Sequence, residues 1–266
     1  MRGSKHAGMA TVGAAALVVI AVACSGGGSS TTADTTAMQG SSTSIVAGPP
    51  QSLAPLHGHY APSISSGDFG TVVDNRYWPL TPGTTFHYQG IRGTTPQTNT
   101  VTVTNKTKQI LGITCTVVRD TVFEHGTVVE RTFDWYAQDL QGNVWYMGED
   151  SFELQHGRMA KASDSWESGV AGAQPGIIMP AAPQPGDAYR QEFYPPGQAL
   201  DEARVLRLDG NVTVPYGSFG GLLVTSERSP LEPQTEQKYY EPGLGEVQEV
   251  VVKGHHEEFR LVKVTH

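Results

Sequence analysis

Short runs of β-branched and aromatic residues, each interrupted by Gly, Pro or Asn, fill the chain from Asp74 to His266. In the stretch 99–107, Val101 and Val103 alternate with threonines, which is the period of a strand with one buried face. The 31 glycines and 17 prolines of the whole chain supply the frequent turns that such short strands need. The sequence therefore predicts an all-β fold with minor helix, in a single β domain over residues 74–266.

Individual strands can be assigned from this pattern. They are expected at residues 85–90, 99–107, 113–124, 127–138, 143–147, 152–155, 158–162, 188–194, 203–208, 212–215, 221–228, 236–241, 245–253 and 257–265. Residues that tolerate a positive φ predict hairpin turns at 125–126, 141–143, 156–157, 209–211 and 254–255. Open twisted sheets rarely exceed about ten strands without curling or splitting. We therefore expect an antiparallel β meander curled into a half-barrel or sandwich, and we favour the half-barrel.

The N-terminus has the layout of an export signal. Arg2 and Lys5 precede a stretch from Ala7 to Ala23 that contains no charged residue, which predicts a signal peptide over residues 1–23. A permanent transmembrane anchor is the alternative, although the apolar run is short for a spanning helix. The segment from Ala21 to Cys24 resembles a bacterial lipobox. This resemblance implies cleavage before Cys24 and attachment of lipid to its thiol, whereas a plain secretory cleavage remains the alternative.

Gly, Ser, Thr, Ala and Pro dominate the stretch that follows Cys24. Such a composition cannot bury enough apolar surface to offset the entropy of ordering, so residues 24–73 are expected to form a lipidated, flexible tether. His57 and His59 interrupt it at a spacing compatible with a metal chelate, but solvated histidines explain them better. The expected location is the extracytoplasmic face of the cell membrane, where Cys24 makes the membrane itself a partner.

Charge and cysteine content exclude several classes of protein. The chain has 18 Lys and Arg against 26 Asp and Glu, a formal net charge of −8, so it lacks the basic face that nucleic acid requires. Cys24 and Cys115 are the only cysteines. If Cys24 carries lipid, Cys115 has no partner for an intramolecular disulfide, and its apolar strand predicts a buried, inert thiol.

No constellation in the sequence specifies catalysis, a metal or a cofactor. Ser218 lacks the spacing of a nucleophile elbow, and a turn explains it better. The pair His255 and His256 with the two following glutamates is not a zinc signature, since successive residues of a strand face opposite ways. The acidic residues between Glu149 and Glu167 have no specific spacing for sugar hydrolysis. Whether the chain is an enzyme is left open, with a non-catalytic protein favoured.

Two non-catalytic hypotheses remain. Residues 169–186 are predicted to form a long loop that contains several prolines. Its apolar patch of Ile177, Ile178 and Met179 is a candidate ligand contact. The first hypothesis is a binding module for a small apolar or amphipathic ligand sheltered by the curled sheet. The second is a cell-envelope structural module that contacts a protein or glycan through an aromatic face, for which Trp135 and Trp145 are the candidates.

Motifs at both ends of the domain resemble those of an uncharacterised family of bacterial exported lipoproteins. Tyr77 to Gly83 is similar to a Tyr-x-Pro-Leu-x-x-Gly opening, and Tyr240 to Val247 is similar to a Tyr-x-x-Gly-x-Gly-x-Val closing element. Segments 133–150 and 172–180 are similar to the central part of the same group. The resemblance implies the β fold, the extracytoplasmic location and the domain boundary, and it supplies no catalytic residue.

Overall fold

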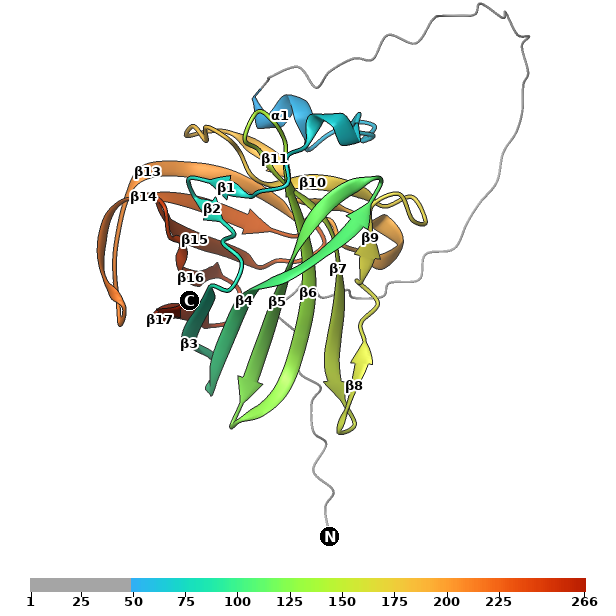
Figure 1. Cartoon of the computed structure of the whole chain (residues 1–266). Helices are drawn as coiled ribbons and strands as arrows, with labels where there is room; N and C mark the ends of the chain where they lie inside the picture. Colours follow the sequence, from blue (N-terminus) through green and yellow to red (C-terminus); the bar gives the residue numbers. More distant parts are fainter. Residues whose placement is uncertain (1–48) are drawn as a thin grey trace, which may run out of the picture.

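The computed structural model describes residues 49–266, and its antiparallel strands confirm the all-β prediction (Figure 1). The strands of the first half are β1 (Asp74–Asn75), β2 (Trp78–Pro79), β3 (Thr85–Arg92), β4 (Thr95–Ile110), β5 (Ile113–Glu124), β6 (Thr127–Gln138), β7 (Val144–Gln155), β8 (Arg158–Lys161) and β9 (Trp166–Glu167). Those of the second half are β10 (Gln174–Met179), β11 (Ala188–Arg190), β12 (Glu192–Phe193), β13 (Glu202–Val214), β14 (Gly217–Arg228), β15 (Thr235–Glu241), β16 (Gly245–Lys253) and β17 (Glu257–Thr265).

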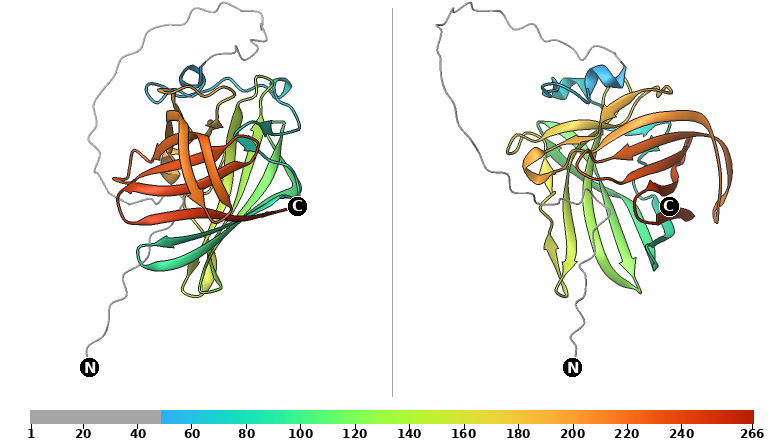
Figure 2. Two further views of the ribbon diagram at one scale, coloured as in Figure 1. Left: turned by 90° about the vertical axis from the view of Figure 1, so that its left-hand side faces the viewer. Right: turned by 180° about the vertical axis from the view of Figure 1, so that it is seen from behind.

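Fifteen of these strands form one sheet, in the order β11-β13-β14-β15-β16-β17-β3-β4-β5-β6-β7-β10-β12, with β8 and β9 also paired to β7. Strands β3 to β7 run down the page in Figure 1, whereas β13 to β16 run across it, so the sheet curls strongly between its two halves (Figures 1 and 2). The sheet stays open and does not close into a barrel. This agrees with the predicted curled meander.

The two edges of the curled sheet meet through a single residue, Gln191. Arg190 of β11 pairs with Glu202 at one end of the sheet, and Glu192 of β12 pairs with Pro175 at the other end. A Cβ atom at Gly176 would overlap the backbone of Gln191, so only glycine permits this close approach. We call this junction of β10, β11 and β12 the seam.

The segment 49–73 departs from the flexible tether expected there. It contains the short helix α1 (Pro50–Leu53) and a 3-10 turn (Ser66–Asp68), and Ala54 and Tyr60 are buried. The composition of this segment is that of a flexible tether, but a few of its apolar side chains pack against the seam. The sequence alone does not show that this packing surface exists. The remainder of the expected tether, residues 24–48, lies outside the described residues, as do the signal peptide and Cys24.

Two loops of the sequence prediction are strands in the structure. The proposed turn at 209–211 lies inside β13, where Gly210 sits at a register shift, and the chain instead turns after Val214. The expected loop 169–186 contains β10, which pairs with β7. The prolines on both sides of this apolar run predicted a loop. In the structure the run pairs with the edge of β7 and forms a strand.

The fold has little helix. No helix within residues 49–266 is long and apolar enough to cross a membrane. Large exposed hydrophobic side chains in this part of the chain include Leu140 and Tyr216, and Tyr216 stacks on the half-buried ring of Phe219.

Candidate functional site

A cavity of about 310 Å³ occupies the concave side of the curled sheet, between its two halves. Inward-facing positions of β3 to β7 line one wall, and positions of β14 to β17 line the other. On β6 these positions follow the strand period, so that Glu130, Thr132, Asp134 and Tyr136 all face the cavity. The curl of the sheet thus collects side chains that lie far apart in the sequence.

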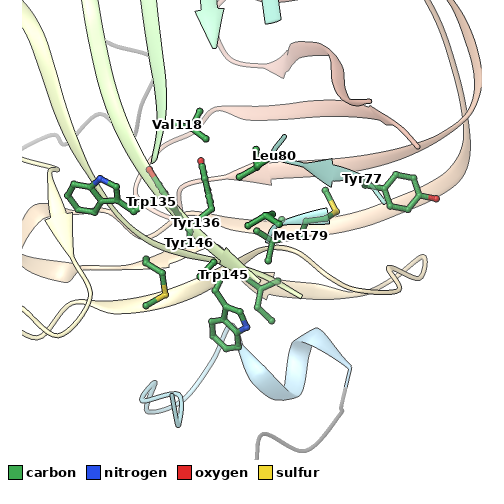
Figure 3. Packing of buried hydrophobic residues seen from close by; sticks show 14 of the residues in the cluster. Tyr77, Leu80, Val118, Trp135, Tyr136, Trp145, Tyr146 and Met179 are labelled. Atoms are coloured by element: carbon green, nitrogen blue, oxygen red, sulfur yellow. The ribbon is translucent and has the colours of Figure 1, made fainter. Parts of the chain in front are cut away.

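Aromatic rings form part of this lining. Its six members are Trp78, Phe86, Tyr88, Tyr136, Tyr146 and Phe259. The Tyr136 and Tyr146 rings stack with centroids 4.9 Å apart, and Trp78 meets Tyr136 edge-on at 5.5 Å. Figure 3 shows Tyr136 and Tyr146 close together, with Leu80 and Val118 nearby. The rings are held by one another and present fixed surfaces to the cavity.

Carboxyl groups outnumber every other polar group in the lining. The eleven are Asp120, Glu130, Asp134, Glu149, Glu192, Asp201, Glu227, Glu232, Glu236, Glu246 and Glu249. Among the described lining residues the only cations are Arg228 and Lys238. Burying so many carboxyl groups is costly, because buried carboxylates are tolerated only when they are paired, hydrogen-bonded or protonated.

Glu227 and Lys238 anchor the half of the cavity built from β14 to β16. Lys238 Nζ lies 3.4 Å from a carboxylate oxygen of Glu227 and 3.4 Å from one of Glu249. Glu227 also accepts hydrogen bonds from Thr225 Oγ1 at 2.6 Å and Gln191 Nε2 at 3.0 Å. Although burial raises it, Lys238 and these donors hold the pKa of Glu227 below its usual range. Glu227 is therefore ionised, and its charge is already matched inside the protein.

The opposite half, built from β5 to β7, has no cation of its own in the described lining. Burial raises the pKa of Asp120 to about 6 and that of Asp134 to about 7. Burial also raises the pKa of Glu149 well above its usual range, and the nearby carboxyl of Glu192 adds to this rise. These carboxyl groups would gain most from an incoming positive charge.

Asp134, Tyr146 and Glu149 share one hydrogen-bonded arrangement, which we call the Tyr146 trio. The Tyr146 hydroxyl lies 2.7 Å from Asp134 Oδ1 and 3.0 Å from Glu149 Oε2. A tyrosine hydroxyl has one hydrogen, so it can donate to only one of the two carboxylates. Both contacts are hydrogen bonds only if the other carboxyl retains a proton and donates it to the tyrosine oxygen. One of the two carboxyl groups of the trio is therefore protonated.

The structure separates the three residues of the predicted ligand loop. Ile178 faces the cavity and contributes to its lining, whereas Ile177 and Met179 are fully buried in the core behind it. The three residues belong to strand β10. Because successive side chains of a strand point to opposite faces, a single residue of the apolar patch reaches the cavity.

Trp135 and Trp145 do not form the exposed aromatic face expected from the sequence. Their side chains are 4% and 1% exposed, respectively. Lys108 Nζ covers the Trp135 ring at 3.2 Å from its centroid, and Trp145 Nε1 donates to Asp139 Oδ2 at 2.8 Å. Figure 3 shows both tryptophans pointing away from Tyr136 and Tyr146. Their sequence neighbours, one position later, are the rings that face the cavity.

The other sequence candidates are dispersed. Of the acidic residues between 149 and 167, Glu149 alone lines the cavity, while Asp150 pairs with Lys161 on the outside. His255, in the turn before β17, contacts the buried carboxyl group of Glu257 at 2.9 Å. No group of three or more metal-ligating side chains converges anywhere within residues 49–266.

Cys115 is buried, which confirms the reading of its strand. Its side chain has no exposed surface, and burial raises the pKa of its thiol to about 12. A thiol in this state remains protonated and is a poor nucleophile.

Fold and site together define the class of this protein: an open, curled antiparallel sheet that encloses an acidic and aromatic cavity. No family model matches the chain, and no curated protein sequence matches it. A solved structure from Bacteroides fragilis NCTC 9343, named as an exported protein with a YmcC-like fold, is similar to it at 11% identity and a TM-score of 0.41, covering 72% of this chain and 100% of its own.

A second solved structure, from Parabacteroides distasonis ATCC 8503, is named as a lipoprotein. It is similar at 11% identity and a TM-score of 0.40, covering 72% of this chain and 99% of its own. The motif resemblance to exported lipoproteins stays a prediction. At these values neither likeness carries an argument about function.

Proposed function

We propose that this chain is an extracytoplasmic, non-catalytic binding protein whose cavity takes an amphipathic organic cation of the alkylammonium type. The observation that carries the proposal is the lining, which combines eleven carboxyl groups and six aromatic rings with only two cations among the described residues. An ammonium group donates hydrogen bonds to carboxylates and is attracted to ring faces, while the rings also shelter an alkyl chain. A purely apolar ligand would bring no counter-charge to Asp120, Asp134 and Glu149 in the half of the lining that has no cation.

The location is part of the same proposal. The uncharged run before Cys24 and the small residues at the junction support export and lipid attachment at that cysteine. Mass spectrometry of the mature N-terminus tests this: a diacylglyceryl adduct on Cys24, lost in Cys24→Ala, is expected. An unmodified N-terminus that begins elsewhere would contradict the anchor and leave the cavity proposal standing.

Binding can be tested with three probes that share one chain and differ in charge: hexylammonium, hexan-1-ol and hexanoate. We expect isothermal titration of the full chain, at about pH 8, to detect binding of the ammonium with an affinity at least about tenfold above that of the alcohol, or about 1.4 kcal/mol. Hexanoate should not bind, because its charge repels the cavity carboxylates. Equal binding of ammonium and alcohol would contradict the proposal.

A further inference from the structure

Three carboxyl groups form a line along the inner face of β5 and β6, which we call the carboxyl row. Glu130 and Asp134 lie four residues apart on β6 and face the cavity. Asp120 of β5 is the register partner of Thr132, so it lies beside the midpoint between them. The Tyr146 trio, which includes Asp134, forms one end of the row, and Glu130 forms the other.

Glu130 supplies a separate indication that the row receives a ligand. Its side chain is 7% exposed and lines the cavity, yet Oε2 has no hydrogen-bond partner among the described residues. Buried polar atoms in proteins are almost always hydrogen-bonded, so an orphaned carboxylate oxygen in a cavity wall calls for an external donor. Asp120 Oδ1 is likewise unpartnered, although Asn99 Nδ2 donates to its other oxygen at 3.2 Å.

The spacing of the row identifies the kind of donor. Strand geometry of about 3.3 Å per residue separates Glu130 from Asp134 by about 13 Å. Asp120 lies about 6.6 Å along the strand from each of them but on the neighbouring strand, about 4.8 Å to the side, so its Cα atom is about 8 Å from theirs. Two nitrogens joined by four to six methylene groups lie about 6 to 9 Å apart when the chain is extended, from ordinary single-bond lengths. A linear chain with amines at such intervals therefore places one positive charge beside each carboxyl group.

We infer that the ligand is a linear polyamine, whose ammonium groups lie along the carboxyl row from Glu130 to the Tyr146 trio. This inference rests on the proposed function and narrows it from alkylammonium ions in general to chains with two or more amines. Leu80, Phe86 and Val101 line the same cavity and would cover the methylene groups. Lys238 lies on the opposite wall, where Glu227 and Glu249 hold it.

The test compares spermidine and 1,6-diaminohexane with hexylammonium, by isothermal titration of the full chain at about pH 8. We expect spermidine and 1,6-diaminohexane to bind at least about tenfold more tightly than hexylammonium, because their second ammonium group can pair with a second carboxyl group of the carboxyl row. Glu130→Gln should lower the affinity for 1,6-diaminohexane about tenfold and that for hexylammonium by less. Glu258→Gln is the matched control, because Glu258 lies outside the cavity lining and pairs with Arg260.

Three results would overturn the inference. If hexylammonium binds and the polyamines bind no more tightly, the carboxyl row does not select amines by spacing, and the proposed function stands without it. If Glu130→Gln and Glu258→Gln weaken diamine binding equally, the loss is one of general charge and not of a contact at Glu130. If none of the three amines binds, both the inference and the proposed function fail. Circular dichroism shows whether each variant is folded.

Discussion

The guanidinium of Arg190 lies 5.6 Å from the centre of the Tyr60 ring, and this contact joins the N-terminal segment to the seam of the sheet. Arg190 also donates from Nε to Pro55 O at 2.9 Å and from Nη2 to Leu56 O at 2.6 Å. Its backbone N–H donates to Ala54 O. Tyr60 in turn donates to Pro175 O of β10 at 2.6 Å, so segment 49–60 crosses the seam from β11 to β10.

Arg190→Lys should loosen this segment, because lysine cannot reproduce the planar fork that bonds two carbonyls and stacks on a ring. We expect the free energy of unfolding to fall by about 1–3 kcal/mol, the cost of charge-assisted hydrogen bonds. Hydrogen exchange should speed up at residues 54–60. Arg204→Lys is the control, since Arg204 is exposed and makes one long contact. Unchanged exchange at 54–60 would show that Arg190 does not hold the segment.

Gly176→Ala tests the close approach at the seam. The added Cβ would overlap the backbone of Gln191, which cannot move without disturbing β11 and β12. We expect a loss of more than about 2 kcal/mol in urea unfolding. Gly67→Ala is the matched control, because its Cβ would meet only Ser65 Oγ at 3.9 Å and its φ is not positive. Equal stability of the two variants would mean that the seam is not packed as described.

Much of the sheet could be predicted from sequence alone. The bounds of β5, β6, β16 and β17 agree with the predicted strands, because clear turn residues flank each of them. The sequence prediction was wrong where pairing with a distant strand determined the secondary structure. Residues 176–179 pair with β7 in spite of the flanking prolines, and 209–211 continue a strand across a glycine that was predicted to form a turn.

The candidate site could not be predicted in the same way. Asp120, Asp134 and Glu149 belong to three different strands and look like scattered acidic residues in the sequence. Only the register of β5 with β6, and the curl of the sheet, brings them to one cavity. One signal was present: acidic residues at inward positions of strands that are otherwise apolar, such as Asp120 between Val118 and Val122, are unusual.

The stability of the protein should fall as pH rises from about 5 to 8. Burial raises the folded-state pKa of Asp120 to about 6, of Asp134 to about 7 and of Glu246 to about 8, whereas the unfolded chain has ordinary values near 4. The folded state therefore binds more protons in this range, and deprotonation favours unfolding. We expect the Tm to fall by roughly 5–10 °C.

Asp134→Asn should flatten this pH dependence, because an amide does not titrate. Asp150→Asn is its control, since Asp150 pairs with Lys161 and lies outside the cavity lining. A Tm that stays constant or rises between about pH 5 and 8 would contradict the burial of unpaired carboxyl groups.

The Tyr146 trio predicts that ligand binding releases a proton. An ammonium group that bonds both carboxylates displaces the proton that the trio stores, so about one proton should leave per hexylammonium bound at about pH 7. Titrations in buffers of different ionisation enthalpy count the protons. In Glu149→Gln the amide donates to Tyr146 permanently, so release should fall toward zero. Equal release from this variant and the unaltered chain would place the proton elsewhere.

The central claim is that the cavity binds an organic cation through its carboxyl groups. A crystal structure of the full chain with hexylammonium tests it most directly. The account predicts the ligand inside the cavity, with its nitrogen within about 3 Å of a carboxylate oxygen of Asp120, Asp134 or Glu149 and its alkyl chain against the aromatic rings. A ligand bound outside the cavity, or with its alkyl end at these carboxylates, would contradict it.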